Sequence, residues 1–314
     1  MKKLIKITVI VLLAVLVGIF FTLYYLGNRP AVPNDYQQSV ETGGQLEAGF
    51  LAAGSFAVSV YEEPVLQPFK KYVIYYPSEL ETTSRRYPVI VLCNGSGTPL
   101  SKYPALPRHY ASWGFIVIGT EEEYAWSGFD AEMSVRHLQR LNDTEQIEEE
   151  KANIFYQKVD FDHVGIAGHS QGGVGVLNAI TAQEHRDIYQ AAVSLSPTNK
   201  ELALALEWDY DASLVQIPTL LISGAGGGDD WVVTGEQLES IYRDIPGSKI
   251  MARRKNTPHN EVLYSADGYV TAWFLWHLQG DQEAGRVFTG EHPELTENPL
   301  YQDVRLSIEG GDSP

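Results

Sequence analysis

Beyond about residue 58, short continuous apolar runs alternate with segments whose apolar residues recur at helical spacing. Runs of four to eight apolar residues are typical of strands, and the helical spacing predicts amphipathic helices. The first two predicted strands are separated by Glu62-Glu63-Pro64, so we expect them to pair as an antiparallel edge. We predict strands over 58–61, 72–76, 87–93, 115–118, 164–167, 191–195, 219–223 and 249–252, and helices over 105–113, 131–141, 171–182 and 268–278. This alternation predicts an α/β fold, a mostly parallel sheet flanked by helices.

The N-terminal part of the chain has a different pattern. Lysines at positions 2, 3 and 6 precede an apolar run over 7–26 that is long enough, at about 1.5 Å per residue, to cross a hydrocarbon core of about 30 Å. We predict an uncleaved signal anchor, a transmembrane helix within residues 1–27, with a cleaved secretory signal as the alternative. The lysines place the N-terminus in the cytoplasm and the rest outside the cell membrane. Residues 28–37 then form a linker, and residues 38–314 form the folded domain.

The composition and net charge of the chain limit the classes of partner that it can bind. The chain has 314 residues, 44% of them hydrophobic, which is enough for one large domain. The net charge of −17 argues against a nucleic-acid partner, because phosphate backbones are bound by clustered Lys and Arg. Cys93 is the single cysteine, so an intrachain disulfide is excluded, and its apolar strand context predicts a buried, inert thiol.

The segment Gly168-His169-Ser170-Gln171-Gly172 carries the most specific chemistry. It follows a predicted strand and precedes a predicted helix, which is the context of a nucleophile elbow, G-x-S-x-G. In such a turn the serine backbone is strained, and side chains in place of the two glycines would collide with neighbouring backbone. We therefore predict Ser170 as a nucleophile, with the backbone amide of Gln171 directed at a developing oxyanion.

A serine hydroxyl needs a base, and the base needs an orienting carboxylate. Two later strands end in loops that carry Asp229-Asp230 and His259, giving the chain order serine, acid, histidine. We assign His259 as the base and Asp230 as the acid, because Asp230 begins a D-x-V-V run that commonly follows the acid in such enzymes. Asp229 is the alternative.

Further site residues follow from the loops at the same end of the sheet. Backbone amides after Cys93, foremost that of Ser96, would complete the oxyanion site opposite Gln171. Trp126 and Trp231 lie on loops at this end and are candidates for the substrate pocket wall. His169, inside the elbow, is assigned to packing. We expect no cofactor and no metal, because the chain has no H-E-x-x-H or comparable spacing and Asp229 interrupts the glycine run required for a dinucleotide loop.

Together, Asn94-Gly95-Ser96-Gly97, the Gly168–Gly172 elbow, Asp230 and His259 resemble the α/β-hydrolase superfamily. Within it, the spacing from Gly95 to Trp113-Gly114-Phe115 is most similar to the group of dienelactone-hydrolase-like enzymes, chlorophyllases and bacterial cutinases that cleave polyesters. The resemblance covers about residues 50–285, and it implies the α/β-hydrolase fold and an oxyanion amide at Ser96. Polyester-cleaving members often have an aromatic residue at the position of Ser96 and a C-terminal disulfide, and neither is present here.

These features predict a membrane-anchored extracytoplasmic serine hydrolase that cleaves carboxylic esters through an acyl-enzyme. The expected substrate is a small-molecule or lipid-like ester. An amide or peptide hydrolase, or an acyltransferase, would use the same three residues. A catalytically silent α/β-hydrolase scaffold that serves as a surface binding protein is the alternative from a different class. The sequence leaves the acyl chain, the alcohol and the oligomeric state open.

Overall fold

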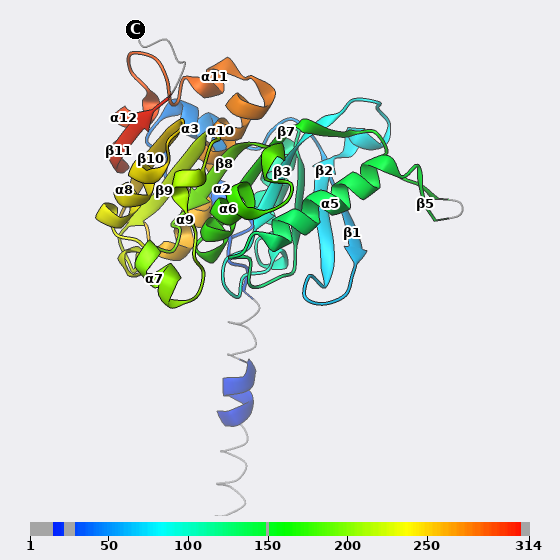
Figure 1. Cartoon of the computed structure of the whole chain (residues 1–314), viewed down its shortest axis with the longest axis horizontal. Helices are drawn as coiled ribbons and strands as arrows, with labels where there is room; N and C mark the ends of the chain where they lie inside the picture. The colour runs from blue at the N-terminus through cyan, green and yellow to red at the C-terminus, as the bar shows by residue number, and fades with distance from the viewer. Residues whose placement is uncertain (1–14, 22–28, 149–150, 309–314) are drawn as a thin grey trace, which may run out of the picture.

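The structure, a computed structural model, describes residues 15–21, 29–148 and 151–308. Its centre is a nine-stranded sheet of order β1-β2-β4-β3-β7-β8-β9-β10-β11 (Figure 1). The six strands from β4 to β10 in this order run parallel, while β1, β2 and β11 are antiparallel to their neighbours. The predicted α/β class with a mostly parallel sheet is therefore confirmed.

The strands of this sheet are β1 (Val58–Pro64), β2 (Lys71–Pro77), β3 (Tyr87–Cys93), β4 (Ile116–Thr120), β7 (Val159–His169), β8 (Tyr189–Leu195), β9 (Thr219–Ala225), β10 (Lys249–Lys255) and β11 (Tyr301–Ser307). A separate pair is formed by β5 (Gln146–Glu148) and β6 (Lys151–Ala152). The helices are α2 (Tyr36–Ser39), α3 (Gln45–Leu51), α4 (Ala105–Ser112), α5 (Phe129–Asp143), α6 (Gln171–Ala182), α7 (Lys200–Ala205), α8 (Gly235–Asp244), α9 (His259–Ser265), α10 (Asp267–Gln279), α11 (Gln282–Gly285) and α12 (Glu294–Glu297).

Two hydrophobic cores form because the central strands are apolar on both faces. Along β3, Ile90 and Leu92 enter a core with α4 and α10, whereas Val89, Val91 and Cys93 enter the core on the other face with α5, α6 and α8. Alternate residues of a strand point to opposite faces, so an uninterrupted apolar run requires cover on both sides. The result is a three-layer sandwich, with α5 and α6 in front of the sheet in Figure 1. Cys93 is a buried free thiol, as predicted.

The packed part of the chain begins before Gln38. Val32 and Tyr36, which lie in the predicted 28–37 linker, are fully buried. The Tyr36 hydroxyl donates a hydrogen bond of 2.5 Å to Asp267 Oδ2 at the start of α10. The polar residues of this segment suggested a linker, but the side chains of Val32 and Tyr36 are anchored in the domain.

The N-terminal anchor prediction falls largely on positions 1–14 and 22–28, outside the described residues. Residues 15–21 are helical and exposed. Among the residues that the structure describes, no helix combines the length and the apolar character needed to cross a membrane.

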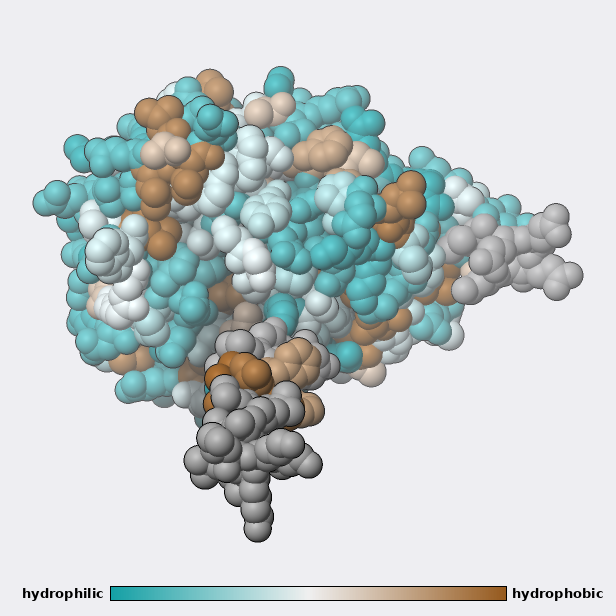
Figure 2. All heavy atoms as spheres, turned by 90° about the horizontal axis from the view of Figure 1, so that it is seen from below, coloured by the Kyte–Doolittle hydropathy of each residue, from teal (hydrophilic) through white to brown (hydrophobic). Residues whose placement is uncertain are grey.

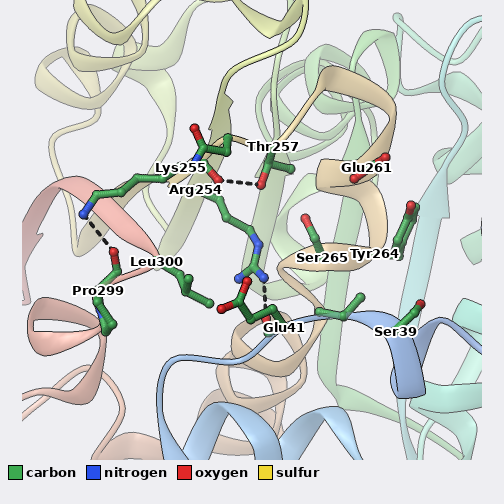
Figure 3. A pocket seen from close by; sticks show the side chains of 12 residues that line it. Ser39, Glu41, Arg254, Lys255, Thr257, Glu261, Tyr264, Ser265, Pro299 and Leu300 are labelled. Carbon is green, nitrogen blue, oxygen red and sulfur yellow. Dashed lines mark hydrogen bonds between the residues drawn. The ribbon is translucent and has the colours of Figure 1, made fainter.

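The C-terminal tail, which the sequence pattern left unassigned, adds the edge strand β11 to β10. A buried polar cluster fastens it to the N-terminal segment. Glu47 on α3 accepts hydrogen bonds from Arg254 (3.0 Å), Asn298 (2.8 Å) and Tyr301 (3.2 Å). Arg254 also bonds the backbone oxygen of Glu41, beside a cavity of about 480 Å³ (Figure 3). These contacts hold α3, β10 and β11 together, and β10 leads into the loop before His259.

Candidate functional site

Ser170 lies at the turn between β7 and α6, where the chain is strained. Its φ of 60° and ψ of −122° are unfavourable for any residue with a side chain. A Cβ atom on Gly172 would lie 2.2 Å from the Cys93 carbonyl oxygen, and one on Gly168 would lie 2.2 Å from that of Gly172. Both glycines are therefore sterically required. The local sequence produces a nucleophile elbow, as expected from the pattern.

His259 begins α9 and is held by Asp229. Its Nδ1 atom lies 2.6 Å from Asp229 Oδ1, and the Asp229 carboxyl is fully buried. The other carboxylate oxygen of Asp229 accepts a hydrogen bond of 2.6 Å from the amide of Gly224. Asp229 thus fixes the imidazole so that Nδ1 donates to the carboxylate and Nε2 can act as a proton acceptor.

The prediction that Asp230 contacts His259 is wrong, and Asp229 takes that position. Asp230 instead accepts a hydrogen bond of 2.6 Å from Arg253 Nη2, and its side chain is 62% exposed. Gly227 and Gly228 have φ values of 47° and 101°, so the chain turns sharply before the short 3₁₀ helix Asp229–Trp231. This turn directs the first aspartate inward and the second outward. The D-x-V-V pattern identified the correct loop but not the correct residue.

Ser170 and His259 line one cavity of about 480 Å³, which also contains Ser96 and Gly95. A Cβ atom on Gly95 would lie 3.8 Å from Ser170 Cβ, so this loop packs against the elbow. Within the described chain, the backbone amides of Ser96 and Gln171 donate to no other group, and Gln171 is the first residue of α6. Free amides at a helix N-terminus stabilise negative charge.

The two tryptophans proposed for the pocket lie elsewhere. Neither Trp126 nor Trp231 lines the cavity, and Trp231 is 86% exposed. The cavity wall is instead completed by Pro30 and Ala31 from the N-terminal segment and by Asn260 and Leu263 from α9. The sequence did not predict Pro30 and Ala31 as cavity residues, because a local sequence pattern does not indicate which distant loops a segment will contact.

His169, assigned to packing from the sequence, also positions the site. Its Nε2 atom lies 2.8 Å from the backbone oxygen of His259, and the two rings are 4.5 Å apart between centroids. Burial, together with the nearby His259 ring, lowers the pKa of His169 to about 3. A neutral His169 that donates from Nε2 therefore tethers the start of α9 to the elbow.

The carboxyl group of Asp130, in the first turn of α5, is buried. Asp130 is 3% exposed, and neither of its carboxyl oxygens has a hydrogen-bond partner among the described residues. Burial raises the pKa of Asp130 from 3.8 to about 7, although backbone amides at the helix start partly oppose the shift. Burying this charge costs free energy at neutral pH.

The Asp130→Asn variant should remove this cost. The pKa of Asp130 is higher in the folded protein than in the unfolded chain, so the unfolded chain releases this proton at a lower pH. The contribution of Asp130 to stability therefore falls as pH rises from about 4 to about 7. We expect Asp130→Asn to match the wild type near pH 4 and to exceed its free energy of unfolding at pH 8 by on the order of 4 kcal/mol.

Urea unfolding across this pH range measures the difference between variant and wild type. The exposed Asp187 serves as the control, and Asp187→Asn should show no such pH dependence. A constant difference for Asp130→Asn between pH 4 and pH 8 would contradict the raised pKa.

The described residues contain no group of three or more His, Cys, Asp or Glu side chains that could hold a metal ion. The site instead combines a strained serine, a histidine fixed by a buried carboxylate, and two free amides. On this sheet, the arrangement defines an α/β-hydrolase with serine at the nucleophile position.

Comparison with known proteins agrees with this class. Residues 34–256 match the family model described as PETase, PET hydrolase-like. This match covers more than half of the chain, so the protein belongs to the PET hydrolase-like family, which confirms the resemblance to the cutinase-like group of α/β-hydrolases.

One similar protein is the bis(hydroxyethyl) terephthalate hydrolase of Streptomyces coelicolor (strain ATCC BAA-471 / A3(2) / M145), at 25% identity over 175 residues. The aligned region covers 56% of this chain and 50% of that protein. The chain therefore spans about half the length of this curated relative.

Proposed function

We propose that the protein is a membrane-anchored, extracytoplasmic serine hydrolase that cleaves carboxylic esters. The single observation that carries the chemistry is the contact of 2.6 Å between His259 Nδ1 and the buried Asp229, in a cavity shared with Ser170. Membership of the PET hydrolase-like family and the likeness to a protein named as a terephthalate ester hydrolase support ester bonds as the target. The 7–26 apolar run and its preceding lysines support the anchor and the outward orientation.

In the proposed reaction, Ser170 Oγ attacks the ester carbonyl carbon while His259 Nε2 accepts the hydroxyl proton. The carbonyl oxygen becomes an oxyanion, which the amides of Ser96 and Gln171 stabilise. When the bond to the alcohol breaks, His259 returns the proton to the leaving oxygen and an acyl-enzyme remains. Water then attacks this ester with His259 again as base, and the acid and free Ser170 are released.

Asp229 is a positioning residue in this scheme. It keeps the Nδ1 proton on its own side of the ring and stabilises the imidazolium that forms in each half-reaction. Its burial and its hydrogen bond from Gly224 fix its own orientation.

The same residues would serve an amide hydrolase, so the leaving group decides between the two activities. We expect kcat/KM for p-nitrophenyl butyrate to exceed that for the matched butyryl p-nitroanilide at least about 100-fold. One reason is that the carbonyl group of an amide is less reactive than that of an ester. The other is that, among the described residues that line the cavity, no charged side chain besides His259 could donate a proton to an amine leaving group. Comparable turnover of the two substrates would contradict an ester-specific site.

A further inference from the structure

The N-terminal segment enters the domain at the rim of the active-site cavity. Pro30 and Ala31 line the cavity together with Ser170 and His259. The position is fixed, because the amide of Ala31 donates a hydrogen bond of 2.6 Å to the oxygen of Lys102, and the adjacent Val32 is fully buried. The chain that leads to the apolar run therefore leaves the domain beside the candidate nucleophile.

Covalent geometry limits how far the cavity can lie from the end of that run. The apolar run ends at Leu26, five residues before Ala31. A fully extended chain spans at most about 3.6 Å per residue, so this distance is at most about 18 Å. If the run is held in a bilayer, the cavity must lie close to the membrane surface.

The same end of the sheet exposes large apolar side chains. The loop between β1 and β2 belongs to this end, because Tyr72 at the start of β2 pairs with Thr120 at the end of β4. Six of the eight exposed large apolar residues described beyond position 21 lie in this loop or in the segments 121–129, 196–206 and 226–231, which directly follow the carboxyl ends of β4, β8 and β9, whereas Val60 lies on β1 and Leu214 lies shortly before the start of β9. They are Leu66, Tyr124, Phe129, Leu204, Leu206 and Trp231.

Figure 2 looks onto this face from below and shows brown apolar atoms at several places around the N-terminal segment, among teal polar atoms. Scattered single apolar residues are ordinary on a protein surface. Here, however, six of them lie at the same end of the sheet as the cavity that Pro30 and Ala31 line. That arrangement suits a lipid surface, where apolar side chains reach the headgroup and acyl boundary.

We propose that this face lies against the membrane and that the site takes its ester from the lipid phase. The inference rests on the proposed ester hydrolase function and adds the substrate class, an apolar ester resident in the bilayer. The net charge of −17 opposes binding to anionic lipid. Contact therefore depends on the tether and on the apolar side chains, and a zwitterionic bilayer suffices.

The test compares two esters with the same leaving group. The full-length protein is reconstituted in phosphatidylcholine vesicles and assayed with water-soluble 4-methylumbelliferyl acetate and with 4-methylumbelliferyl oleate placed in the bilayer. The variant Leu66→Ser/Leu204→Ser removes two side chains of the face, which are 89% and 67% exposed and lie outside the cavity. The control Val60→Ser/Leu214→Ser removes two exposed side chains outside this group, because Val60 lies in the middle of β1 and Leu214 lies beside Tyr189 at the start of β8.

We expect both variants to hydrolyse the acetate within about twofold of the wild type. Only Leu66→Ser/Leu204→Ser should lose activity on the bilayer ester, by at least about tenfold. Equal rates of the two variants on the oleate, or a wild type that cleaves the acetate but not the oleate, would overturn the membrane-facing site and leave the esterase intact. A wild type that cleaves neither ester would overturn the esterase itself.

Discussion

Ser170→Ala is expected to lower kcat for p-nitrophenyl butyrate by about 10⁴-fold or more, because the acyl-enzyme can no longer form. Removal of a nucleophile leaves only the background rate that the oxyanion site and substrate binding provide. Alanine can occupy the same strained backbone, with φ of 60°, at the same cost as serine, so the fold should persist.

Kinetics with purified variants, together with thermal unfolding, separates loss of chemistry from loss of fold. Ser213, an exposed residue on the loop before β9, provides the control, and Ser213→Ala should retain wild-type kcat. If Ser170→Ala were to keep more than a tenth of wild-type turnover while folded, Ser170 would not be the nucleophile.

Asp229→Asn and Asp230→Asn are expected to differ by orders of magnitude, although the residues are adjacent. Only Asp229 contacts His259, and an asparagine in its place would favour the wrong imidazole tautomer, at a cost of about 10⁴-fold in kcat. The Asp230 side chain is 62% exposed, and the buried Arg253 that it contacts also lies 3.7 Å from Asp303, so Asp230→Asn should remain within a few-fold of wild type.

Steady-state kcat values on one soluble ester decide between the two aspartates. Their position in the same short turn makes each variant a control for general disturbance of the loop. A greater loss with Asp230→Asn would contradict the assignment of Asp229 as the residue that orients His259.

The sequence predicted most of the elements that carry the site, because their signals are local. β3 is an uninterrupted apolar run, and the elbow is a contiguous strand, turn and helix whose G-x-S-x-G pattern is visible in the sequence, although Gly172 itself is required by its close approach to Cys93 of β3. The edge strand β11 was missed because only Tyr301 is fully buried, and the half-buried Val304 and Leu306 alternate with polar residues such as Asp303 and Arg305. Its pairing with β10 depends on tertiary contacts rather than on its own composition.

Site details that depend on side-chain direction or on distant segments were less predictable. The choice between Asp229 and Asp230 rests on two glycines with positive φ, whose effect on the turn cannot be read from residue types alone. The placement of Pro30 and Ala31 at the cavity, and of His169 against the backbone of His259, arises from segments far apart in sequence. Local patterns locate the reactive residues, whereas the pocket wall requires the folded chain.

The central claim is that Ser170 forms a covalent intermediate, and peptide mass spectrometry after labelling tests it most directly. The folded protein is treated with a fluorophosphonate, digested, and examined for the added phosphonyl mass. We predict a single adduct on the peptide that contains Ser170, absent from Ser170→Ala and strongly reduced in Asp229→Asn. An adduct on another serine, or a folded wild-type protein that takes no label, would contradict the proposal and favour a non-catalytic binding scaffold.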